Sequence, residues 1–202
     1  PFAMLEENIE EENFEDSLTA LFTTIFGNDL VDLLINGDEE SVDPFLSTNN
    51  GIIAIMDSDT GVRKENYEAG TKKSEIFKLM LKKLPNQWKK NKKGLIYLCS
   101  PATEEEYRDE IAGRATVLGD KALTEDTNST YKGIEVVPEA AMPDDQIILT
   151  NPKNIVFGWH KRYIRVGRFV NESKRQVEYT ITTKADQEYG ISDAIIKYKQ
   201  AA

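Results

Sequence analysis

Residues 33–38 read LLINGD, and residues 45–53 read FLSTNNGII. Before this junction, apolar residues recur at steps of three and four, which is the spacing of one helix face. They are Phe14, Leu18, Leu21, Phe22, Ile25, Leu30, Leu33 and Leu34. The pattern predicts a long helix that buries this stripe and ends at Asn36-Gly37, where glycine can take a positive φ. Gly27 marks a candidate kink. Taken alone, the segment is that of an ordinary core helix with a glycine stop.

The chain has 202 residues, a net charge of −10 and one cysteine, Cys99. This length suits one large domain or two small ones. The acidic balance argues against a broad basic face for nucleic acid, and a single cysteine excludes an intrachain disulfide and fits a reducing compartment. No apolar run approaches the roughly 20 residues that span a bilayer, and no signal peptide is visible, so we expect no membrane partner. Because the sequence starts at Pro1, we expect an N-terminal part to lie outside it.

Charge is unevenly placed along the sequence. Residues 6–16 carry seven acids, among them Glu10, Glu11 and Glu12. Six lysines surround Trp88, namely Lys82, Lys83, Lys89, Lys90, Lys92 and Lys93. The lysines form either a solvated face or a patch that contacts an acidic surface. In the second case the acids of one copy could meet the lysines of another, in a contact that salt would weaken.

The remaining elements follow from apolar spacing and turn residues. We expect helices over 74–84 and from a capping box at Thr103 and Glu106, which is followed by inward-facing residues up to Ala115. Residues 52–55 are either a strand or a buried turn, and residues 119–133 form a long exposed loop that includes Thr124, Asp126 and Asn128. Strands are expected at 95–99, 134–137, 147–149, 155–157, 163–166, 177–182 and 194–198. These elements indicate an α+β protein.

Few residues could carry chemistry. Cys99 lies in an apolar strand and reads as a small hydrophobe, and His160, the only histidine, reads as solvated or stacking. Asp57 and Asp59 resemble part of a calcium loop that lacks its further ligands. Paired acids such as Asp144 and Asp145 are usually solvated in turns. We therefore expect no catalytic residue, no metal and no cofactor, and the chain is not expected to be an enzyme.

The segments taken in order resemble the major capsid proteins of tailed double-stranded DNA bacteriophages, which have the Hong Kong 97-like fold. The resemblance rests on the spine-helix end at 35–38 with the glycine-isoleucine step at 50–52, the strand and methionine-proline turn at 133–145, and the late strands at 147–149, 154–158, 163–166 and 191–195. It covers nearly the whole chain. We expect most of the family's N-terminal arm and extended loop to lie outside this sequence.

The resemblance implies a spine helix with antiparallel sheets, in a peripheral domain at 1–94 and 162–202 and an axial domain at 95–161. It implies a structural protein that self-assembles into the icosahedral shell of a bacteriophage or prophage. It further implies pentamers and hexamers of this chain, scaffold and portal partners, only indirect contact with packaged DNA, synthesis in the bacterial cytoplasm, and residence in the virion. The lysines, acids and loop residues named above become candidate subunit contacts. The alternative is a non-enzymatic α+β binding or adaptor module, such as another phage structural component.

Overall fold

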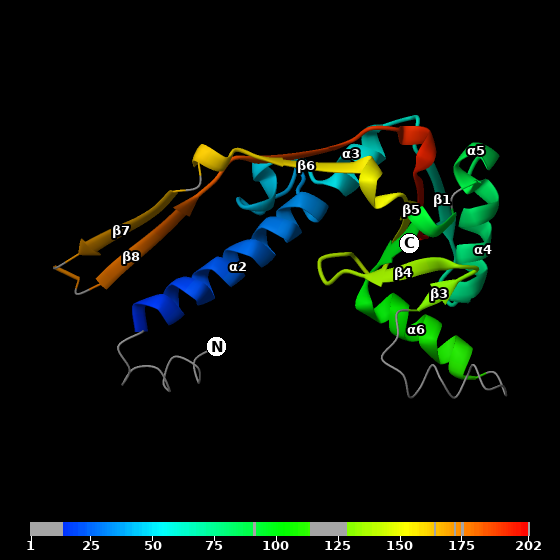
Figure 1. Ribbon diagram of the computed structural model, residues 1–202, viewed down its shortest axis with the longest axis horizontal. Coiled ribbons are helices and arrows are strands. Elements are labelled where there is room, and N and C mark those ends of the chain that lie inside the picture. Colours follow the sequence, from blue (N-terminus) through cyan, green and yellow to red (C-terminus); the bar gives the residue numbers. More distant parts are fainter. Residues whose placement is uncertain are drawn as a thin grey trace.

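The computed structural model describes residues 14–90, 92–113, 129–163, 165–171, 173–174 and 176–201. The described part is elongated (Figure 1). A lobe built on a six-stranded sheet lies at one end, and a long helix and a β-hairpin extend from it toward the other.

The six-stranded sheet has the order β1-β10-β5-β2-β4-β3. Its strands are β1 (Arg63–Tyr67), β2 (Ile96–Cys99), β3 (Thr130–Tyr131), β4 (Ile134–Pro138), β5 (Gln146–Thr150) and β10 (Ile196–Gln200). Two of its pairings, β1 with β10 and β2 with β4, are parallel, and the others are antiparallel. This sheet is therefore mixed, while the antiparallel pairing that was expected holds for the majority of its strand pairs.

Helices cover both faces of this sheet. Every residue of β5 is buried, and its side chains alternate between two apolar clusters, as the strand period of two requires. Ile147 and Leu149 pack with α4 (Lys73–Lys83) and α6 (Pro101–Ala112), while Ile148 packs with α3 (Ile52–Ser58). A short helix, α5 (Asn86–Lys89), follows α4. The lobe thus has an apolar core on each face of the sheet, and Ile35 and Tyr189 of the extended part also pack into the second core.

The extended part consists of α2 (Phe14–Asn36) and two antiparallel strand pairs. The first pair joins β6 (Ile155–Trp159) to β9 (Ala185–Tyr189), and the second joins β7 (Arg165–Asn171) to β8 (Gln176–Thr182). Short 3-10 turns connect the elements at η1 (Leu46–Thr48), η2 (Lys92–Gly94), η3 (Pro152–Asn154), η4 (Lys161–Tyr163) and η5 (Ser192–Ala194). The β6–β9 ribbon carries the β7–β8 hairpin away from the lobe (Figure 1).

Two glycines let the chain cross itself where α2 ends. The Gly51 N–H donates to the Gly37 carbonyl at 2.7 Å, and the Gly37 N–H donates to the Leu33 carbonyl at 2.9 Å. A Cβ on Gly51 would lie 2.6 Å from the Gly37 nitrogen and 2.6 Å from the Ile35 oxygen. The predicted reason for Gly37 was wrong, because positive φ among described glycines occurs only at Gly70 and Gly133. The junction needs glycine for close backbone approach.

Three predictions about local secondary structure differ from what the structure shows. Residues 52–55 belong to a helix, α3, in which Ile52, Ile53 and Met56 are buried on one side. The cap of α6 is Ser100, whose Oγ accepts from the Thr103 N–H at 3.2 Å, so the expected capping box begins three residues too late. Strands β1 and β9 were missed because their sequences, RKENY and ADQEY, carry too few apolar residues to show alternation.

The six-stranded sheet crosses the domain boundaries that the sequence suggested. Strands β2, β4 and β5 come from 95–161, but β1 and β10 come from the ranges assigned to the other domain. The register ties Tyr198 of β10 to Ile147 of β5. Strands from both predicted ranges therefore pair within one sheet, and the division into peripheral and axial domains stays a prediction.

Helix α2 does not bury its apolar residues within this chain. Of its described side chains only Ile35 is buried, and Ile25 is 45% exposed. The stretch Leu18–Asn36 is long and apolar enough to cross a bilayer, contrary to the expectation that no run approaches that length. One such helix is weak evidence for a membrane span. The burial expected for α2 has to come from outside the described chain.

Candidate assembly surfaces

The extended ribbon exposes large apolar side chains. Among them Phe169 is 63%, Val166 62% and Trp159 60% exposed. Val156, Phe157, Tyr163 and Val170 complete the set on β6, η4 and β7. Isolated apolar residues on a surface are ordinary, but a run of this length on two consecutive strands is typical of an interaction surface. No sequence prediction identified these residues as contacts, although the apolar runs were visible there.

The β7–β8 hairpin has two different faces. On one face Val166 is opposite Ile181, Arg168 is opposite Tyr179, and Val170 is opposite Val177. Tyr179 approaches Phe22 of α2, with ring centroids 5.5 Å apart. This face is thus held toward α2 by an aromatic contact while Val166 and Val170 stay exposed. The predicted alternation over 177–182 is confirmed, since Tyr179 and Ile181 are partly buried between exposed neighbours.

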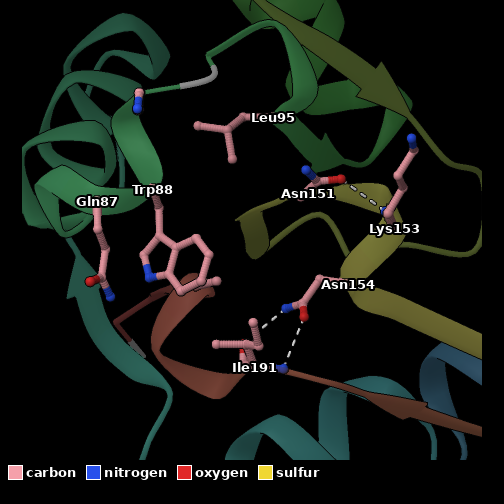
Figure 2. A pocket seen from close by; sticks show the side chains of 9 residues that line it. Gln87, Trp88, Leu95, Asn151, Lys153, Asn154 and Ile191 are labelled. Carbon is pink, nitrogen blue, oxygen red and sulfur yellow. Dashed lines mark hydrogen bonds between the residues drawn. The ribbon is translucent and has the colours of Figure 1, made fainter.

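A pocket of about 620 Å³ opens between α5, η3 and η5. Trp88, Leu95, Ile191 and Ala194 supply its apolar surface. Figure 2 shows the six-membered ring of Trp88 directed toward the space in front of Leu95 and Ile191. Asn154 braces the opposite wall, because its amide accepts from the Ile191 N–H and donates to the Ile191 carbonyl, both at 2.9 Å.

Two lysines give this pocket a positive charge. Lys90 and Lys153 line it, and both are exposed. The nearby Asp193 carboxylate is paired with the Arg63 guanidinium, from which it accepts at 2.8 Å. The pocket can therefore hold an apolar side chain beside negatively charged groups.

The structure divides the predicted contact residues. The four predicted lysines cluster as the sequence suggested: Lys82 and Lys83 lie in the last turn of α4, Lys89 ends α5, and Lys90 follows it. Lys83 is engaged by Glu65 at 2.5 Å, and Lys89 donates to the Lys82 carbonyl at 3.2 Å. Only Lys90 of the four lines the pocket. Glu10, Glu11, Glu12, Thr124, Asp126 and Asn128, like Ala115, lie outside the described residues.

Hydrogen bonds connect α6, which precedes residues 114–128, to Ser129 and Thr130, which follow them. Glu104, which is nearly buried, accepts from the Arg108 guanidinium at 2.6 Å and from the Ser129 hydroxyl. The Tyr107 hydroxyl donates to the Thr130 carbonyl at 3.0 Å. Helix α6 thus fixes the point at which the chain returns to the sheet.

The side chains that could take part in catalysis or metal binding are buried or contact other side chains of the fold. Cys99 is fully buried, and burial raises the pKa of its thiol to about 12, which suppresses the reactive thiolate. His160 is exposed and meets Tyr163 edge-on at 4.6 Å, which confirms the stacking interpretation. Asp57 accepts from Lys197 and Asp59 from the Tyr189 hydroxyl, both at 2.7 Å. Within the described ranges no cluster of acids, histidine and cysteine could hold a metal ion.

Comparison with known proteins finds a relative that is named as a prophage capsid protein. No protein-family model matches the chain. YqbE of Bacillus subtilis (strain 168), whose name describes a prophage capsid protein, is 28% identical over 204 residues. The match covers 96% of this chain but 64% of YqbE, so the chain spans just under two thirds of that relative.

Solved structures of shell particles superpose on nearly the whole chain. The procapsid of satellite phage P4 matches with a TM-score of 0.72 at 11% identity, covering 98% of this chain and 67% of the other. The chain has the Hong Kong 97-like capsid fold. The SrpI encapsulin of Synechococcus elongatus PCC 7942 shares it with a TM-score of 0.66, 13% identity and coverage of 98% and 69%. The capsid of an empty GTA particle matches with a TM-score of 0.65 at 15% identity, covering 98% of this chain and 70% of the other.

The Hong Kong 97-like fold accounts for the shape seen here. The resemblance inferred from the sequence is confirmed, including the long helix that ends at the asparagine-glycine turn. Because the matches cover 98% of this chain, the exposed ribbon and α2 fall within the shared fold.

Proposed function

We propose that this chain is the shell-forming structural subunit of a bacteriophage or prophage capsid. The observation that carries the proposal is the Hong Kong 97-like fold over 98% of the chain, joined to a ribbon that the chain alone leaves uncovered. Burial of apolar surface contributes about 25 cal/mol per Å². Copies that cover Trp159, Val166 and Phe169 therefore gain stability that a monomer lacks.

The fold divides between the two proposed roles at boundaries other than those first expected. We assign the axial role to the six-stranded sheet with α3, α4, α5 and α6, because these supply most of the residues of the two cores. The peripheral role falls to α2, the β6–β9 ribbon and the β7–β8 hairpin. Pentamers and hexamers, scaffold and portal partners, indirect contact with packaged DNA, cytoplasmic synthesis and a structural role without catalysis belong to the same proposal.

Substitution on the hairpin tests the proposal. Phe169→Asp places a charge where assembly needs an apolar contact, and Thr180→Asp is the matched control, since Thr180 is exposed and polar on the same hairpin. Phe169→Asp should abolish closed particles in electron micrographs of the full-length protein while its melting temperature stays within about 2 °C of the parent. Thr180→Asp should still assemble. Normal shells from Phe169→Asp would contradict the assignment of the ribbon to subunit contacts.

The alternative is a binding or adaptor module with one different partner. It predicts a stoichiometric complex with that partner and no self-assembly, which light scattering after size-exclusion chromatography would detect.

A further inference from the structure

We propose that the pocket between α5, η3 and η5 receives the acidic segment 6–12 of a second copy of this chain. The inference rests on the proposed function, because a shell supplies the second copy, and it goes further by naming the two surfaces that meet.

The pocket has the chemistry of a site for a peptide side chain. Its volume of about 620 Å³ lies within the range of ordinary ligand pockets, about 300–1,000 Å³. Trp88 and Leu95 form an apolar wall, and Ile191 is 44% exposed although it faces them. An apolar side chain placed there would cover surface that the single chain leaves in water.

The surroundings of the pocket select an acidic ligand. Residues 86–94 carry Lys89, Lys90, Lys92 and Lys93 and no acid. Lys153 adds a further charge from the other side of the pocket. All five lie in a chain whose net charge is −10, so this concentration of positive charge is local.

The segment 6–12 supplies the complement. It reads EENIEEE, in which Ile9 stands between two acids before it and three after it, with Asn8 as its only uncharged polar residue. Residues 1–62 contain 15 acids and no lysine or arginine, so nothing in this region repels the lysines. Ile9 can occupy the apolar pocket while Glu7 and Glu10 approach the lysines.

Chain length shows that the segment must come from another copy. Helix α2 has 23 residues and is about 33 Å long at 1.5 Å per residue. Glu6 lies eight residues before Phe14, so a fully extended chain reaches about 29 Å at most. Helix α5, which carries Trp88 of the pocket, lies beyond the C-terminal end of α2 as seen from the start of that helix (Figure 1). The segment of the same chain therefore falls short, and a neighbour has to provide it.

A peptide titration tests the site directly. Trp159→Phe leaves Trp88 as the only tryptophan, and a synthetic peptide of residues 1–16 is then titrated while Trp88 fluorescence is followed. Lys90→Glu with Lys153→Glu should weaken binding at least tenfold, and 0.5 M salt should weaken it comparably. Lys174→Glu, an exposed lysine in the hairpin turn, is the matched control and should have little effect.

Peptide variants identify the ligand chemistry. Ile9→Ser should weaken binding about fivefold or more, and replacing the five glutamates of segment 6–12 by glutamine should abolish it. The inference is overturned if the peptide leaves Trp88 unchanged, if Lys174→Glu acts like the pocket variants, or if a short DNA duplex displaces the peptide at equal concentration.

Cross-linking between copies tests the origin of the segment. In a Cys99→Ala background, one tagged full-length copy carries Glu10→Cys and a differently tagged copy carries Lys153→Cys. Mixed assemblies should cross-link the two tags, and Glu10→Cys with Lys174→Cys should not. Closed shells without the cross-link overturn this inference and leave the proposed function standing. Peptide binding by a protein that never forms shells would support the pocket and overturn the proposed function.

Discussion

Adding one methyl group at the crossing of α2 and α3 should destabilise the protein more than most surface changes. In Gly51→Ala the new Cβ would lie 2.6 Å from the Gly37 nitrogen and 2.6 Å from the Ile35 oxygen. Both are backbone atoms, which cannot rotate away as a flexible side chain would. Ordinary contact distances would require them to move by about 0.8 Å.

The cost has two parts. Overpacking of this kind costs about 1–3 kcal/mol. The hydrogen bond from the Gly51 N–H to the Gly37 carbonyl, 2.7 Å long, would be lost or stretched, which costs about 1 kcal/mol more. We therefore expect Gly51→Ala to lower the free energy of unfolding by about 2–4 kcal/mol. For a chain of this length the melting temperature should fall by about 5–15 °C.

Gly27→Ala provides the matched control, because a Cβ there meets nothing within 4 Å and the helix continues through it. Alanine is favoured over glycine in a helix by about 1 kcal/mol, so this variant should melt about 2–4 °C higher. Circular dichroism of unassembled protein measures both. If Gly51→Ala melted within 2 °C of the parent, the close-approach explanation of this junction would be refuted.

Three further predictions follow from the core and the caps. Burial raises the pKa of Cys99 and of Tyr67 to about 12. Both groups are protonated in the folded and unfolded chain below about pH 8.5, where their contribution to stability is fully present. This contribution is lost as the pH rises toward 12, because the unfolded chain then releases the protons more readily than the folded chain. Fluorescence-monitored alkaline unfolding should therefore begin at higher pH in Cys99→Ala. Glu110→Ala removes the carboxylate that accepts from the Lys73 and Ser74 N–H groups, and should cost about 1–2 kcal/mol in urea unfolding, against less than about 0.5 for exposed Glu105→Ala. Phe77→Ala, which empties the centre of a cluster with Tyr97, Tyr107 and Tyr131, should cost about 3–5 kcal/mol by the same measurement.

The sequence predicted the elements whose periodicity is strong. Helix α2 was expected from Phe14 to Asn36, and strand β5 was expected from the run Ile147-Ile148-Leu149. These predictions succeeded because a helix face or a buried run is written locally in the residue order.

The predictions that failed concern elements formed by contacts between residues far apart in the sequence. Strand β1 is polar and is a strand because Arg63–Tyr67 pairs in parallel with β10, about 130 residues later. The apolar run at Ile52 is a helix that begins next to Gly51, whose N–H donates to the carbonyl of Gly37, a residue 14 positions earlier. The six-stranded sheet likewise draws strands from both predicted domain ranges, since sheet order is set by pairing and not by sequence order.

The surfaces were predictable only in part. Lysines around Trp88 were visible as a cluster, but the pocket also needs Asn154 and Ile191 from other segments, and their hydrogen bonds become apparent only in the folded chain. The exposed apolar residues of β6 and β7 looked like core strands, because a sequence records hydrophobicity and not whether the same chain buries it.

Cryo-electron microscopy of particles formed by the full-length protein tests the central claim most directly. We predict a closed shell in which Trp159, Val166 and Phe169 are covered by neighbouring copies. A protein that stays monomeric with every scaffold tried, or a shell in which this ribbon faces solvent on all sides, would contradict it.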